Sequence, residues 1–259
     1  MEKYLGETIP KLGFGLMRLP AADPQTVDLE QTREMVDRFM AAGLKYFDTA
    51  YVYGQGRSEE AIKAALVDRY PREAYYLATK MCAWLECHDA ESARQQLYTS
   101  LKRTGAGYFD FYLLHSLQSD TWESYEKYGL WDFVREQKEK GLIRHWGFSF
   151  HGSPELLEQL LTSHPDAEFV QLQINYADWD DPIIASGRNY EVARRHGKPV
   201  VIMEPVKGGT LAQLPESVSS IFREAAPEAS LPSWAIRFAA SQEGVITVLS
   251  GMSTLAQME

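Results

Sequence analysis

Short apolar segments recur along the chain, each separated from the next by a longer polar segment, and this repeat limits the possible fold more than any other feature. The apolar segments are rich in β-branched and aromatic residues, which favour buried strands. The predicted strands cover residues 12–17, 46–49, 74–80, 108–115, 143–150, 169–174, 199–203 and 244–250. The segments between them have helical spacing with a charged face. The predicted helices cover residues 29–43, 58–70, 89–105, 122–141, 153–164, 189–197 and 231–242.

Eight strands that alternate with helices are typical of parallel βαβ units. A chain of 259 residues has the usual size of one (β/α)8 barrel. The competing fold is an open doubly wound sheet, which favours a G-x-G-x-x-G turn after an early strand. The segments "GFGLMR" and "GQGRSE" both lack its third glycine. We therefore predict an α/β protein with a (β/α)8 TIM barrel, as a single domain over residues 1–259.

The charge and the apolar content exclude several classes of partner. The formal net charge is −10, whereas nucleic-acid-binding proteins are usually basic, and anionic membranes repel such a chain. No apolar stretch approaches the length that spans a bilayer, and "MEKYLGETIP" lacks a signal-peptide core. Cys82 and Cys87 form neither a disulfide framework nor a zinc site. We expect a cytoplasmic protein with no nucleic-acid, membrane or metal partner, and the sequence specifies no oligomeric state.

Ionisable residues end three consecutive predicted strands. Asp48 ends the second strand, Lys80 the third and His115 the fourth, and Tyr53 follows Asp48 on the next loop. The carboxyl ends of barrel strands build the active site, so all four side chains should meet at one end of the barrel. Taken singly, each residue also fits a structural role, as a turn cap, a lysine with its head in solvent, a core histidine or a packed tyrosine.

Together the four residues suit proton transfer. A buried lysine and a buried aspartate are costly unless they pair. An ammonium beside Tyr53 is expected to lower the pKa of the phenol, so that the tyrosine exchanges a proton near neutral pH. His115 can donate a hydrogen bond to a substrate carbonyl oxygen. We expect a proton to reach a carbonyl oxygen while another group delivers hydride.

The motifs around these residues resemble those of the aldo-keto reductases. "FDTAYVYG", "ATK" and "FYLLH" match the strands that carry that family's Asp, Tyr, Lys and His. The resemblance runs from "KLGFGLMRLP" to "VLSGMSTLAQME" and implies the catalytic residues Asp48, Tyr53, Lys80 and His115. "GFSFHG" and "EPVKGG" are similar to a prokaryotic branch that often carries a C-terminal iron–sulfur extension. No cysteine-rich tail is present here, so we expect no metal in this chain.

The resemblance implies a nicotinamide cofactor, usually NADPH, with NADH possible. Ser149 and Gln171 match the residues that hold the carboxamide, and Met203 stands where many relatives stack an aromatic ring. Lys207, Gly208 and Gly209 fit a pyrophosphate-binding loop, because adjacent glycines let backbone N–H groups approach an anion. The remaining predicted cofactor contacts are Gly15, Met17, Pro205, Ser250, Gly251, Ser253 and Gln257.

Two departures concern the adenine end of the cofactor. The chain ends at Glu259, so we expect the last helix to be truncated, before a Glu-Asn pair that relatives use. Gln257 stands where many NADP-specific members have an arginine, and Gly251 where a lysine is frequent. The preference between NADPH and NADH therefore stays open.

The loops after the strands are expected to form the substrate pocket. Residues 81–88, 116–122 and 176–181 supply aromatic and acidic side chains, among them Trp84. An aromatic pocket suits small aldehydes or ketones. We expect an oxidoreductase that transfers hydride from NAD(P)H to such a carbonyl. The alternative is a cofactor-sensing regulatory protein with little turnover.

Overall fold

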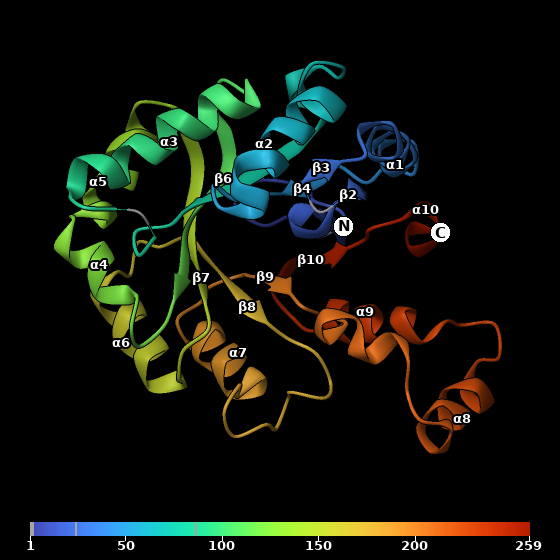
Figure 1. The fold of residues 1–259 in the computed structure, drawn as a ribbon. Helices are drawn as coiled ribbons and strands as arrows, with labels where there is room; N and C mark the ends of the chain where they lie inside the picture. The colour runs from blue at the N-terminus through green and yellow to red at the C-terminus, as the bar shows by residue number, and fades with distance from the viewer. Residues whose placement is uncertain (1–2, 24, 86) are drawn as a thin grey trace.

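A closed barrel of parallel strands forms the centre of the computed structural model, which describes residues 3–23, 25–85 and 87–259 (Figure 1). Around the barrel the strands follow the order β1-β10-β9-β8-β7-β6-β5-β4, and β4 closes against β1. The barrel strands are β1 Leu12–Gly15, β4 Tyr46–Asp48, β5 Tyr76–Met81, β6 Phe109–Leu117, β7 Ile143–Phe150, β8 Phe169–Gln173, β9 Val200–Met203 and β10 Val245–Gly251. The predicted barrel and its eight strands are confirmed.

Helices surround the barrel (Figure 1). They are α1 Leu29–Ala41, α2 Arg57–Ile62, α3 Ala90–Thr104, α4 Trp122–Lys127, α5 Leu130–Glu139, α6 Pro154–Ser163, α7 Ser186–Arg195, α8 Glu216–Ala225, α9 Leu231–Ala240 and α10 Leu255–Met258. Asp89 caps α3 by accepting a hydrogen bond from the Ser92 N–H, and Ser153 caps α6 in the same way through Leu156. Within the described ranges, no helix is long and apolar enough to cross a membrane.

Several elements differ from the sequence-based prediction. The helix predicted over residues 58–70 is α2 followed by a π-helical turn, Lys63–Val67. The helix predicted over 122–141 divides into α4 and α5, because Gly129 has a φ of 62°, which a right-handed helix does not accept. The hairpin of β2 Ala21–Asp23 and β3 Thr26–Val27 was not predicted. Neither was α8, which lies away from the barrel in Figure 1 and buries little apolar surface.

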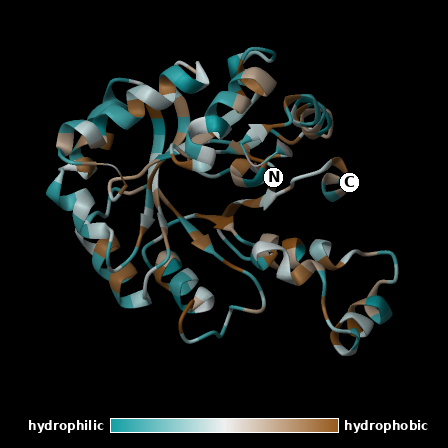
Figure 2. Cartoon of the chain, in the orientation of Figure 1, coloured by the Kyte–Doolittle hydropathy of each residue, from teal (hydrophilic) through white to brown (hydrophobic). Residues whose placement is uncertain are grey.

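Two apolar layers hold the barrel together. The interior is filled by side chains that include Tyr46, Phe111, Phe169 and Ile246, as expected for a barrel with a packed core. A larger layer lies between the outer face of the strands and the helices. In Figure 2 the strands are mainly hydrophobic, whereas the outer helices carry much of the hydrophilic colour. The open space for a site is therefore at the barrel ends.

Strand register places the predicted site residues at the carboxyl end of the barrel. Gly15 is paired with Asp48 on one side and with Gly251 on the other. Ser149 of β7 is paired with Gln171 of β8. Parallel neighbours in register leave the barrel at the same end, so catalytic and cofactor candidates from distant parts of the sequence share one rim.

We predict that Gly147→Ala destabilises the barrel by about 3 kcal/mol, because overpacking a strand contact is costly. A Cβ at this position would lie 2.2 Å from the Phe169 carbonyl oxygen, a backbone atom with little freedom to move. Gly251→Ala is the matched control, since its Cβ would meet only the Gly15 oxygen at 3.9 Å. Chemical denaturation measures both variants. Equal stability of the two would contradict the assigned register of β7 and β8.

Candidate active site

A buried ion pair joins the ends of β4 and β5. Lys80 Nζ donates to Asp48 Oδ1 at 2.5 Å and to the Thr49 carbonyl oxygen at 2.7 Å. The Lys80 side chain is fully buried and that of Asp48 is 3% exposed. Removing one partner from a buried pair leaves an uncompensated charge, which typically costs about 3–5 kcal/mol. The predicted pairing of these residues is therefore present in the fold.

The pair keeps Lys80 protonated. Burial alone would lower the pKa of Lys80, but the Asp48 carboxylate and the Tyr53 hydroxyl outweigh burial and raise it. Burial raises the pKa of Asp48, and the Lys80 charge opposes that rise. A protonated lysine at this position supplies a permanent positive charge at the rim of the barrel.

Tyr53 and His115 complete a cluster around this charge. Tyr53 begins the 3-10 turn Tyr53–Gly56, which follows β4, and Lys80 Nζ lies 4.8 Å from the centre of its ring. His115, near the end of β6, has its ring centre 5.7 Å from that of Tyr53, at an interplanar angle of 76°. The structure thus brings the four predicted catalytic residues together.

The predicted lowering of the tyrosine pKa is wrong for the protein without ligand. Burial raises the pKa of Tyr53, and the neighbouring Lys80 ammonium only partly offsets this. Asp48 and Glu204 add to the rise through their negative charges. Tyr53 is therefore a protonated phenol at neutral pH, which is the form that can donate a proton.

His115 is neutral in this setting. Burial lowers its pKa well below the ordinary value of 6.5, and the charge of Lys80 lowers it further. Its backbone oxygen accepts hydrogen bonds from the Tyr125 hydroxyl at 2.5 Å and from Trp84 Nε1 at 3.2 Å. Within the described residues, His115 Nδ1 is buried without a hydrogen-bond partner. A neutral imidazole with one N–H can donate a hydrogen bond to a carbonyl oxygen.

A second ion pair, between the fully buried Glu59 and the partly exposed Arg103, holds the loop that carries Tyr53. Glu59 of α2 accepts from the Thr79 hydroxyl at 2.7 Å and from Arg103 of α3 at 3.3 Å. Arg103 also donates to the Tyr51 carbonyl oxygen at 3.1 Å. Gly56 has a φ of 92°, and a Cβ there would lie 2.6 Å from the Arg103 guanidinium carbon. No local pattern predicts this support, because Glu59 and Arg103 look like ordinary helix residues and meet only in the folded protein.

The predicted carboxamide site lies between β7, β8 and β9. Ser149 and Gln171 are both buried, and Ser149 Oγ accepts from the Ser116 N–H at 2.7 Å. Gln171 Nε2 contacts Met203 Sδ at 3.4 Å. Among the described residues, Gln171 Oε1 is buried with no hydrogen-bond partner. An amide N–H of a ligand would satisfy this oxygen, so the residues fit a nicotinamide carboxamide.

The predicted anion loop after β9 is a tight turn, in which the Lys207 N–H donates to the Glu204 carbonyl oxygen and the Gly209 N–H to that of Val206, both at 3.0 Å. Lys207, Gly208 and Gly209 have φ values of 49°, 62° and 101°, and the two glycines adopt such values at little cost. The Lys207 ammonium pairs with Asp178, which raises the pKa of Lys207. Asp178 is fully buried and accepts from Asn175 Nδ2 at 2.8 Å. Asp178 belongs to a loop predicted to line the substrate pocket, and it instead supports the anion loop.

Arg18 is a basic residue of this region that the sequence analysis missed. Its guanidinium donates to the Gly208 carbonyl oxygen at 3.1 Å, and its own carbonyl oxygen accepts from Ser253 Oγ at 2.8 Å. Gln257 Oε1 accepts from the Ser253 N–H at 2.7 Å. Three predicted cofactor residues therefore gather around Arg18. No motif marked Arg18, because its position depends on the approach of the turn after β1 to the loop after β9.

The remaining predicted contacts occupy the same rim with different exposure. Ser250 is paired with Phe14 beside the Gly15–Gly251 pair, and Pro205 is buried at the end of β9. The Met17 side chain is 61% exposed, so it leaves the barrel rather than lining a closed pocket. Within the described residues, no group of three or more His, Cys, Asp or Glu side chains could hold a metal ion.

Comparison with known proteins identifies the family. Residues 11–259 match the Aldo/keto reductase family, and the chain belongs to that family. It is 27% identical over 198 residues to the aldo-keto reductase AKR2E4 of Bombyx mori, a match that covers 73% of this chain. The match covers 62% of the Bombyx mori protein, so the chain spans about three fifths of that relative's length.

Solved structures share the fold over nearly the whole chain. The holo form of the aldo-keto reductase AKR11C1 from Bacillus halodurans has a TM-score of 0.76 and 25% identity, covering 98% of this chain and 85% of that one. An aldo-keto reductase from Klebsiella pneumoniae, solved in complex with NADPH, has a TM-score of 0.72 and 20% identity, covering 96% and 83%. The predicted family and barrel are confirmed.

We predict that Tyr53 in the ligand-free protein ionises only above the ordinary tyrosine pKa of 10.0, because burial disfavours the phenolate. The unfolded chain releases this proton near 10.0, so the stability that the neutral phenol contributes is lost as the pH rises past that value. Ultraviolet difference spectra between the wild type and Tyr53→Phe measure the titration. A Lys80→Met variant should ionise at still higher pH. Phenolate absorbance near neutral pH in the wild type would contradict this reading.

Proposed function

We propose that the protein is an oxidoreductase that transfers hydride from NAD(P)H to the carbonyl carbon of small aldehydes or ketones. The observation that carries the proposal is the meeting of Tyr53 and His115 around the buried Lys80–Asp48 pair. These groups lie at the barrel end where active sites form in this fold. Membership of the aldo/keto reductase family supports the same chemistry.

In this proposal each residue has a defined role. Tyr53 donates its phenolic proton to the carbonyl oxygen, and the Lys80 ammonium stabilises the phenolate that remains. Asp48 holds Lys80 in place and keeps it charged. His115 donates an N–H to the same oxygen and orients the carbonyl. Because His115 is neutral, it does not repel the nearby ammonium.

The cofactor is proposed to bind along the rim from Gln171 to Arg18. A bound NADPH would supply the hydride, since no protein side chain does so. Ser149 and Gln171 would hold the carboxamide, with Met203 against the ring. The turn that contains Gly208 would face the pyrophosphate. The unsatisfied Gln171 oxygen is the structural support for this assignment.

Activity is tested by NADPH oxidation with simple aldehydes. Tyr53→Phe should lower kcat by roughly 10²–10⁴-fold, because the proton donor is lost, while NADPH affinity changes little. Fluorescence titration measures that affinity separately. Full activity of Tyr53→Phe would contradict the mechanism. Tight cofactor binding by the wild type without turnover of any carbonyl would favour the cofactor-sensing alternative.

We predict that Arg18→Ala weakens NADPH binding roughly tenfold and NADH binding much less, because a hydrogen bond to a charged group contributes about 1.5 kcal/mol. The Arg18 carbonyl oxygen accepts from Ser253 Oγ, and the Ser253 N–H donates to Gln257, the position where NADP-specific relatives often have an arginine, so Arg18 lies near the expected place of the extra phosphate. Arg33→Ala on α1 is a matched control at a surface arginine. Fluorescence titration with both cofactors measures the dissociation constants. An equal loss of affinity for NADPH and NADH in Arg18→Ala would contradict a role for Arg18 in selecting the cofactor that carries the extra phosphate.

A further inference from the structure

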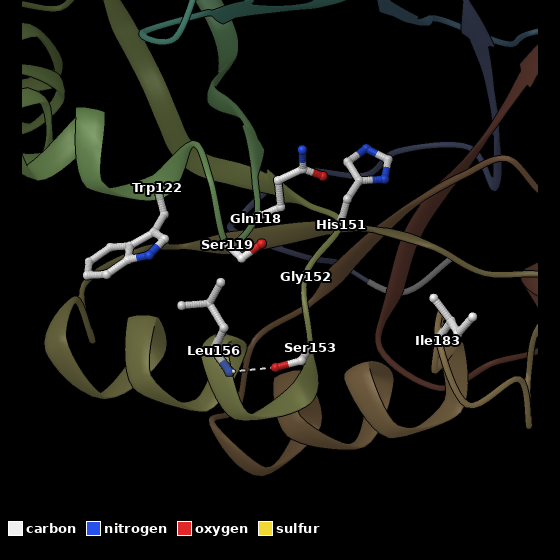
Figure 3. A pocket seen from close by; sticks show the side chains of 8 residues that line it. All are labelled: Gln118, Ser119, Trp122, His151, Gly152, Ser153, Leu156 and Ile183. Atoms are coloured by element: carbon white, nitrogen blue, oxygen red, sulfur yellow. Dashed lines mark hydrogen bonds between the residues drawn. The ribbon is translucent and has the colours of Figure 1, made fainter.

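A cavity of about 370 Å³ opens between the segments that follow β6, β7 and β8 (Figure 3). The loop after β6 contributes Gln118 and Ser119 to its wall, and Trp122 is the first residue of α4. The loop between β7 and α6 contributes His151, and the loop after β8 contributes Ile183. In Figure 3 the Gln118 and His151 side chains lie together along one side, with Trp122 and Ile183 toward opposite ends.

The cavity adjoins the cluster through His115 and His151. Gln118 is on the strand and loop that carry His115, and the His151 N–H donates to the Leu117 carbonyl oxygen at 3.0 Å. The His115 ring lies 5.7 Å from that of Tyr53, and Gln118 follows three residues after His115 on the same segment. A substrate with its carbonyl at Tyr53 and His115 can therefore extend toward this cavity.

The cavity wall combines polar side chains with the apolar side chains of Trp122, Leu156 and Ile183, and it carries no permanent charge. Its described lining includes an amide, hydroxyls and an imidazole, and neither Lys, Arg, Asp nor Glu. Burial lowers the pKa of His151, which favours the neutral ring. Trp122 and Ile183 add apolar surface at the ends. Neutral donors and acceptors beside an indole suit a ligand with hydroxyl groups on a carbon chain.

We propose that this cavity binds the part of the substrate distant from the carbonyl, and that it selects uncharged, hydroxylated carbonyl compounds. The inference rests on the proposed reductase function. A carboxylate in the same position would find no cation in the described lining, in a chain of net charge −10. An alkyl chain would leave the Gln118 amide and the Ser119 hydroxyl unsatisfied by the substrate.

Gln118 is the residue best suited to test the proposal. Its backbone is held in the loop by two hydrogen bonds. The Gln118 N–H donates to Thr121 Oγ1 at 3.0 Å, and the Gln118 carbonyl oxygen accepts from the Trp122 N–H at 3.1 Å. Within the described part of the chain, its side-chain amide makes no hydrogen bond to the protein. Gln118→Leu therefore removes the amide and keeps the loop's backbone contacts. Gln159→Leu, at an exposed position of α6, is the matched control.

The experiment compares kcat/KM for erythrose, butanal and succinic semialdehyde, which share a four-carbon chain and differ in hydroxyl and carboxylate groups. The wild type should prefer erythrose, and succinic semialdehyde should be the poorest substrate. Gln118→Leu should lower the erythrose-to-butanal ratio of kcat/KM roughly tenfold, while Gln159→Leu leaves it unchanged. Ring closure and hydration in solution lower the concentration of each free aldehyde. This effect is the same for every variant, so it cancels when the erythrose-to-butanal ratio of kcat/KM is compared between variants.

The outcomes separate this inference from the function on which it rests. An unchanged ratio in Gln118→Leu, or a wild-type preference for succinic semialdehyde, would overturn the subsite while leaving the reductase function intact. Failure of all three aldehydes to support NADPH oxidation would overturn the reductase function together with the subsite.

Discussion

The buried pair of Lys80 and Asp48 is the constraint on which the rest of the site depends. An ammonium with no solvent exposure is stable only if an anion and other acceptors surround it, and here the Asp48 carboxylate and the Thr49 carbonyl oxygen do so. The pair requires that β4 and β5 be parallel neighbours with Asp48 in register with Ala78, which places Lys80 two residues further along the same face of β5. That register in turn brings Tyr53 over the ammonium and His115 beside it, on the next strand.

The groups around this cluster differ in chemical character. Gln171, Gly208 and Arg18 present an unsatisfied amide oxygen, a glycine backbone and a guanidinium, which together suit a nicotinamide dinucleotide. The cavity at Gln118 and His151 combines polar and apolar side chains and carries no permanent charge.

Much of the fold and of the catalytic cluster could be predicted from the sequence, since both follow from local pattern. Asp48, Lys80 and His115 each end an apolar strand in consecutive βα units, so their meeting follows from the barrel alone. The direction of the Tyr53 pKa shift could not be predicted, because burial is a tertiary property that outweighs the Lys80 charge. The partners Glu59 with Arg103, and Asp178 with Lys207, meet across loops whose paths no local pattern specifies.

A double-mutant cycle on kcat/KM with Lys80→Met and Asp48→Asn tests the central claim most directly. If Asp48 acts only by holding and charging Lys80, the double variant should lose about as much activity as Lys80→Met alone. Circular dichroism of each variant establishes that the barrel is intact. The account would be contradicted if the losses of kcat/KM multiplied. The double variant would then be slower than Lys80→Met by the full factor that Asp48→Asn causes alone.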